Sequence, residues 1–135
     1  MQQLPEPLQA LAQYPQFILW KLADRNGKRV KLPIDYRTAQ VGDAHNPAAW
    51  MSAEQALATL HGYGDGYGLG FVLAASDPFF FLDIDHCLEP DGRNWSALAL
   101  GLCQRLAGAA VEVSQSASGC TLSAPGRFRR IAVKT

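Results

Sequence analysis

Apolar and polar positions alternate with two different periodicities along this chain, and these periodicities predict the order of its helices and strands. Helical spacing runs through residues 4–14, through Leu57 and Leu60 up to Gly62, and through 95–106. Short apolar or alternating runs, typical of strands, occupy residues 17–20, 28–34, 68–73, 79–85, 111–113 and 120–124. Asn26-Gly27 joins the first two runs and predicts a type I′ hairpin, because both central residues of that turn need positive φ.

The order of these elements predicts the fold class. After an N-terminal helix come two strands, a helix, two strands, a helix and two strands. We expect the strands at 68–73 and 79–85 to form the second pair, joined by a turn at 76–78. The sequence therefore predicts an α+β fold, a single compact domain with a mostly antiparallel sheet and flanking helices. We expect this domain to span residues 1–124, followed by a basic tail at 125–135.

Composition narrows the classes of function. The 135 residues are 48% hydrophobic, enough for a core, and the formal net charge is zero, which argues against a globally cationic nucleic-acid binder. Three cysteines (Cys87, Cys103 and Cys120) have no Cys-x-x-Cys spacing, which favours reduced thiols over disulfides or a zinc site. No long apolar run or signal peptide is present, so we expect a cytoplasmic protein with no membrane partner.

The apolar run at 79–82 leads into Asp83-Ile84-Asp85, the pattern with the clearest chemistry. Residues two apart on a strand share a face, so the two carboxylates would repel each other unless a cation lies between them. Mg²⁺ or Mn²⁺ suits two oxygen ligands of this kind, whereas solvated or Arg-paired acids are the alternative. Haloacid-dehalogenase-type phosphatases share the Asp-x-Asp strand, but they expect a threonine where Cys87 stands and a parallel sheet.

Several motifs occur together and in a fixed order around this pair. They are Trp20 before Asn26-Gly27, Lys31-Leu32-Pro33, Asn46-Pro47 before Trp50, Gly68-Leu69-Gly70-Phe71-Val72, Phe81-Leu82-Asp83-Ile84-Asp85, and Val111-Glu112-Val113-Ser114-Gln115-Ser116. In this order, residues 14–124 resemble the N-terminal primase-polymerase domain of phage and plasmid replication proteins, in the archaeo-eukaryotic primase superfamily. The resemblance implies an RRM-like core.

The resemblance also implies site residues. Asp83 and Asp85 correspond to the catalytic pair that binds divalent metal, and Glu112 is either a third ligand or an exposed strand residue. The family's phosphate-binding turn corresponds to Ser114, Ser116, Ser118, Gly119 and Thr121, although Thr121 stands where the family has a histidine. Candidate nucleic-acid contacts are the hairpin cations Arg25, Lys28, Arg29 and Lys31, which a solvated edge hairpin would explain equally well. Further candidates are Arg127, Arg129 and Arg130, which a frayed or truncated C-terminus would explain equally well. His86 is either a further metal ligand or a loop residue.

These implications lead to one functional hypothesis and one alternative. We expect a primase/polymerase-like domain that binds a nucleotide or single-stranded DNA through the Asp83–Asp85 metal site. Other replication proteins are its expected protein partners. No acid follows Glu112 and the phosphate histidine is replaced, so we expect this chain alone to be catalytically incomplete, whether as a fragment or as a degenerate protein. The alternative is a non-enzymatic, degenerate primase-like binding module, an inhibitor or adaptor from a mobile element.

Overall fold

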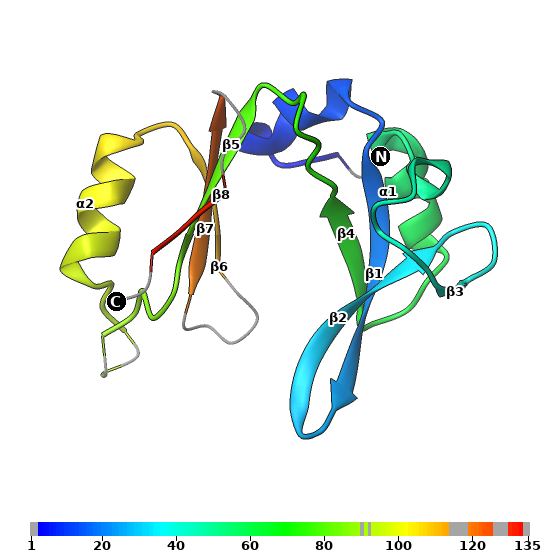
Figure 1. Cartoon of the computed structure of the whole chain (residues 1–135), viewed down its shortest axis with the longest axis horizontal. Helices are drawn as coiled ribbons and strands as arrows, with labels where there is room; N and C mark the ends of the chain where they lie inside the picture. The colour runs from blue at the N-terminus through cyan, green and yellow to red at the C-terminus, as the bar shows by residue number, and fades with distance from the viewer. Residues whose placement is uncertain (1–2, 90, 92, 114–118, 126–129, 134–135) are drawn as a thin grey trace. The chain divides into compact units, whose positions relative to one another are not determined.

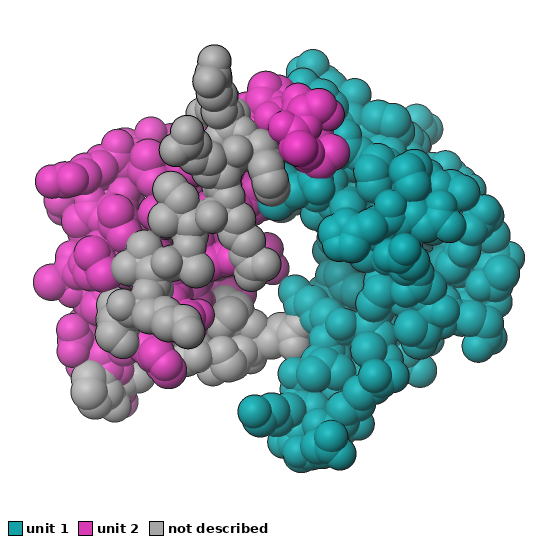
Figure 2. All heavy atoms as spheres, in the orientation of Figure 1, with its two compact units in different colours: residues 1–73 teal, residues 74–135 magenta. Residues whose placement is uncertain are grey.

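The structure, a computed structural model, describes residues 3–89, 91, 93–113, 119–125 and 130–133. Two compact units divide the chain, residues 1–73 and residues 74–135 (Figure 2). Each unit contains a four-stranded sheet, and nearly all strand pairs are antiparallel. The predicted α+β class with mostly antiparallel pairing is therefore confirmed.

The first unit is built around the hairpin that Asn26-Gly27 predicts. Its elements are the 3₁₀ helix η1 (Glu6–Gln13), β1 (Phe17–Arg25), β2 (Lys28–Asp35), β3 (Gln40–Val41), the 3₁₀ helix η2 (Pro47–Ala49), α1 (Ala53–His61) and β4 (Tyr67–Phe71). The sheet has the order β3-β2-β1-β4 (Figure 1). Asn26 and Gly27 have φ of 51° and 74°, as a type I′ turn requires.

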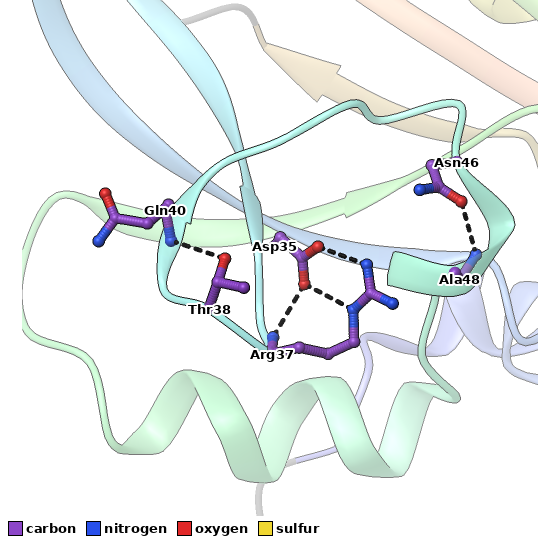
Figure 3. Close-up of polar contacts among 6 residues, drawn as sticks. All are labelled: Asp35, Arg37, Thr38, Gln40, Asn46 and Ala48. Carbon is purple, nitrogen blue, oxygen red and sulfur yellow. Dashed lines mark hydrogen bonds and ion pairs between the residues drawn. The ribbon is translucent and has the colours of Figure 1, made fainter.

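Short polar side chains fix the loops and helix starts of this unit. The side chain of Ser52 accepts a hydrogen bond from the Gln55 N–H at the start of α1, and Asn46 accepts one from Ala48 at the start of η2. After β2, Arg37 donates to the Asp35 carboxylate from its backbone N–H and from two guanidinium nitrogens, at 2.6–2.9 Å (Figure 3). These contacts hold the pKa of the Asp35 carboxyl down at about 2.

Trp20 closes one face of the first sheet. Its indole lies over the glycines of β4, so close that a Cβ on Gly68 would stand 2.2 Å from the ring, whereas one on Gly70 would stand 3.4 Å away. The indole N–H donates to the Leu69 carbonyl at 2.6 Å, and the Lys31 ammonium lies 4.4 Å from the ring centre. On the other face, Leu19 is completely buried. Trp20 is thus a half-buried packing residue of this sheet.

The second unit packs one helix on one face of its sheet. It contains β5 (Phe79–Ile84), α2 (Ala97–Arg105), β6 (Ala110–Val113), β7 (Cys120–Pro125) and β8 (Arg130–Val133), with strand order β6-β7-β5-β8 (Figure 1). β5 pairs antiparallel with β7 and parallel with β8. The core that joins sheet and helix consists of Leu82, Ile84, Cys87, Ala99, Cys120 and Leu122.

Three expectations from the sequence need correction. The strands at 68–73 and 79–85 do not pair with each other, because β4 pairs with β1 and β5 belongs to the second sheet. The second helix begins at Ala97 rather than Trp95, and Leu98 is 42% exposed because Ala99 occupies the buried position instead. β5 ends at Ile84, so Asp85 lies in the turn that follows.

Two further features bear on the predicted organisation. β8 lies within the segment 125–135 that the sequence suggested was a basic tail. Among the described residues, every helix is too short or too polar to cross a membrane.

Candidate functional site

The register of the second sheet places three predicted site residues in one row. Thr121 on β7 is paired with Asp83 on β5 and, across its other edge, with Glu112 on β6. Directly paired residues point to the same face, and their neighbours Leu82, Ile84 and Leu122 point to the helix side. The row Glu112–Thr121–Asp83 therefore lies on the sheet face opposite α2.

Thr121 and Asp83 are joined by a short hydrogen bond. The Thr121 hydroxyl donates to Asp83 Oδ1 at 2.7 Å, and both side chains are half-buried. A hydroxyl bound to a carboxylate in a partly dry site is one of the stronger hydrogen bonds of proteins. The hydroxyl at the position of the family's histidine is therefore engaged with the predicted catalytic carboxylate. This contact could not be predicted from local sequence patterns, because it depends on strand pairing between residues 38 positions apart.

Asp85 and His86 follow the end of β5. Both are exposed, and His86 has a φ of 53°, an uncommon value for a residue with a side chain. A short turn therefore carries the chain away from β5 directly after Ile84. Asp85 is thus placed by the turn, one residue beyond the strand that holds Asp83.

The donor set suits a hard cation, although it is small. Asp83 and Asp85 offer carboxylate oxygens, the ligands that Mg²⁺ and Mn²⁺ prefer, and Oδ1 of Asp83 already accepts the Thr121 bond. Glu112 lies two strands from Asp83, about 10 Å away by the usual strand spacing. Within the described part of the chain, no three His, Cys, Asp or Glu side chains are grouped closely enough to hold a metal ion. A cation here would therefore rely mainly on the aspartate pair and on its other, non-protein ligands.

The structure describes only some of the other residues that the sequence predicted as contacts. Ser114, Ser116, Ser118, Arg127 and Arg129 lie outside the described residues, and Arg130 lies on β8. Gly119 is buried immediately before β7. Lys31 lies on the first sheet against Trp20. The serines and arginines therefore stay predictions.

Cysteines fill the helix side of the sheet behind Asp83. Cys87 is fully buried and Cys120 is 2% exposed, and all three cysteines are free thiols. Burial, together with a hydrogen bond to Cys87, raises the pKa of the Cys120 thiol to about 12. A thiol that resists ionisation is a poor nucleophile or metal ligand, so Cys120 is a packing residue here.

The strand pairing also bears on the phosphatase alternative. That class requires a parallel sheet on both sides of the Asp-x-Asp strand, whereas β5 is parallel only to β8 and pairs antiparallel with β7. The observed pairing therefore argues against a haloacid-dehalogenase-type site.

Comparison with known proteins agrees with the motifs. A protein named "DNA Primase-polymerase" from Nitratiruptor phage NrS-1 is 32% identical to this chain over 121 residues. The match covers 90% of this chain but only 16% of the phage protein, so the chain spans a small part of that relative's length. No family model matches the chain. The similarity confirms the resemblance that the ordered motifs predict.

Proposed function

Because this chain carries a primase-polymerase domain, we propose that it binds a nucleotide or single-stranded DNA through a divalent-metal site at Asp83 and Asp85. The observation that carries the proposal is the half-buried Asp83 on the sheet face opposite α2, held by the Thr121 hydroxyl at 2.7 Å. Mg²⁺ or Mn²⁺ bound there would supply positive charge that offsets the charge of a triphosphate.

The protein's own residues have separate roles in this proposal. Asp83 is the fixed ligand, because strand pairing and the Thr121 bond restrict its rotamer. Asp85, in an exposed turn, is the more adaptable ligand. The predicted serine turn, which precedes β7, would present backbone N–H groups to phosphate. Lys31, Arg127, Arg129 and Arg130 are proposed contacts to the nucleic-acid backbone.

We further propose that this chain alone binds without sustained nucleotide transfer. Two aspartates hold one ion, and no third carboxylate joins them among the described residues. Thr121 offers a neutral hydroxyl in place of the family's imidazole, and that hydroxyl is bound to Asp83. The loss of one preorganised electrostatic partner commonly lowers a rate about 10²–10³-fold.

A binding titration tests the metal site. A fluorescent deoxynucleoside triphosphate is titrated with the chain in Mn²⁺ and in EDTA, using wild type, Asp83→Asn and Asp85→Asn. The matched control is Glu54→Gln, which removes the same charge from the exposed first turn of α1 in the first unit. We expect Mn²⁺-dependent binding that both site variants weaken at least about tenfold and that the control preserves. Equal affinity for all four proteins would contradict the proposed site.

A primer-extension assay separates binding from turnover. Wild type and Asp83→Ala are incubated with a primed template, deoxynucleotides and Mn²⁺, and we expect no extended product from either protein. Product from wild type that is lost in Asp83→Ala would show that the chain is a working polymerase domain.

A further inference from the structure

The end of the β1–β2 hairpin stands apart from the rest of the first sheet. β4 pairs with β1 only over residues 17–21, and β3 pairs with β2 only at 34–35. Residues 23–30 therefore form a two-stranded ribbon that extends past both neighbouring strands (Figure 1). A two-stranded ribbon is marginally stable by itself, so this one depends on the rest of the sheet for its stability.

Cations are concentrated on this ribbon and at its base. Residues 21–31 contain five cations and a single acid, Asp24, although the whole chain has no net charge. The register divides these charges between two faces, because directly paired residues share a face. One face carries Asp24 paired with Arg29, and also Lys31, which lies over the Trp20 ring. Asp24 and Arg29 form an exposed ion pair at 3.9 Å, so part of the charge on this face is neutralised.

The opposite face, which we call the Lys21 face, carries Lys21, Arg25 and Lys28. Arg25 and Lys28 stand directly opposite each other next to the turn, and both are exposed. Like charges placed opposite each other destabilise a strand pair, and an anion bound between them would relieve that repulsion. Neither residue forms an ion pair within the described part of the chain. The Lys21 face therefore has an excess of positive charge that suits a polyanion.

Aromatic rings continue this face at its base. Lys21 is paired with Tyr67 on β4, and its ammonium lies 5.5 Å from the centre of the Tyr67 ring. The Tyr63 ring is 4.8 Å from the Tyr67 ring, tilted by 52°. Asp65 is the exposed acid in the turn between the two tyrosines. Cations beside half-buried aromatic rings are the combination that proteins use to hold phosphates and stacked bases of single strands.

We propose that the Lys21 face binds single-stranded nucleic acid, with Arg25 and Lys28 contacting phosphates and the Tyr63–Tyr67 pair stacking on bases. This inference rests on the proposed function and deepens it, since it assigns strand binding to a surface that needs no metal. Lys21, Tyr63 and Tyr67 were not among the site residues predicted from the sequence. Their only signals there are a cation in a strand and two tyrosines around a glycine-rich turn.

The first test measures the binding of fluorescent dT20 in EDTA over a range of salt concentrations. A matched pair of variants, Arg25→Gln and Arg29→Gln, removes the same charge from opposite faces of the hairpin. We expect Arg25→Gln to reduce the slope of log K against log[salt] by about 0.7 and Arg29→Gln to leave it unchanged. The double change Arg25→Gln/Lys28→Gln should reduce the slope by about 1.4 and weaken binding at least about tenfold. Equal effects of Arg25→Gln and Arg29→Gln would overturn the assignment to this face.

The second test separates bases from phosphates. An abasic oligonucleotide of the same length should bind at least about fivefold more weakly than dT20 to wild type, because stacking is lost. Tyr67→Leu should bind both strands alike, and circular dichroism checks that it folds. Equal binding of the abasic strand by wild type, or equally strong competition by polyglutamate, would assign the face to acidic polymers in general and overturn the proposal.

The dT20 experiments can overturn the proposal for the Lys21 face without overturning the proposed metal site, and the reverse also holds. We expect wild type to bind dT20 in EDTA, in which the metal site holds no ion. Strand binding that occurs only with Mn²⁺ and is lost in Asp83→Asn would overturn the role of the hairpin while supporting the metal site. Absence of dT20 binding to wild type under all conditions would overturn the hairpin proposal and leave the Mn²⁺–nucleotide titration to decide on Asp83.

Discussion

Replacement of Thr121 by valine should reveal how strongly its hydroxyl holds Asp83. Valine keeps the branched shape that suits a strand, so the change mainly removes the 2.7 Å hydrogen bond to Asp83 Oδ1. Hydrogen bonds to charged groups contribute about 1.5–3 kcal/mol, and both side chains here are half-buried, so we expect a loss of about 1.5 kcal/mol. Thr121→Ser retains the hydroxyl and loses one half-buried methyl group, so it should cost only about 0.4 kcal/mol.

Native-state hydrogen exchange is the suitable assay, because it reports the stability of the second unit directly. The amides of Leu82 and Leu122, on the two strands that this bond joins, should exchange about tenfold faster in Thr121→Val. A double-mutant cycle with Asp83→Ala isolates the pair and should give a coupling energy of at least about 1 kcal/mol. A coupling energy below about 0.3 kcal/mol would refute the claim that Thr121 fixes Asp83.

Three further predictions concern packing, titration and reactivity. Gly68→Ala should destabilise the first unit by about 2 kcal/mol, because its Cβ would meet the indole at 2.2 Å, whereas Gly70→Ala should be near neutral; equal urea midpoints would contradict this. The Arg37 contacts stabilise the ionised Asp35 carboxyl, so their contribution is present above the ordinary pKa of 3.8 and is lost as pH falls through about 2. An NMR titration of Arg37→Gln should show that the pKa of Asp35 has returned toward 3.8, and an unchanged pKa would assign the shift to another cause. Cys120, with a thiol pKa of about 12, should resist iodoacetamide at pH 8 in the folded chain and react after unfolding in urea; fast labelling of the folded chain would contradict its burial.

Local signals in the sequence predicted most of the elements. Asn26-Gly27 specifies its turn because few residue pairs accept positive φ at both positions. Ser52 specifies the start of α1 because its side chain can accept from the Gln55 N–H. Both effects operate within four residues, so they can be read without knowledge of the fold.

The partition of strands between sheets could not be predicted in this way. Nothing local to the strand at 67–71 shows whether it joins β1 or β5, since both of these strands begin with an apolar run. Gly68 carries the deciding information, because only a glycine at this position leaves room for the Trp20 indole. That role is visible only once Trp20 is known to lie opposite Gly68.

For the candidate site, too, local features could be predicted from the sequence and long-range contacts could not. The motif predicted Asp83 as a strand carboxylate, and the strand is present. The contact between Thr121 and Asp83 depends on register between segments 38 residues apart, which no local pattern specifies. Sequence order aligned Thr121 with the family's phosphate-binding histidine, and only the strand register shows that its hydroxyl donates to Asp83.

Paramagnetic broadening by Mn²⁺ tests the central claim, the metal site at Asp83 and Asp85, most directly. Amide signals of a ¹⁵N-labelled chain are followed as Mn²⁺ is added in substoichiometric amounts. We expect the amides of Asp83, Asp85 and Thr121 to broaden first and the same amides to stay sharp in Asp83→Asn. Broadening that spares these amides and begins elsewhere, or that is identical in Asp83→Asn, would contradict the metal site and with it the proposed function.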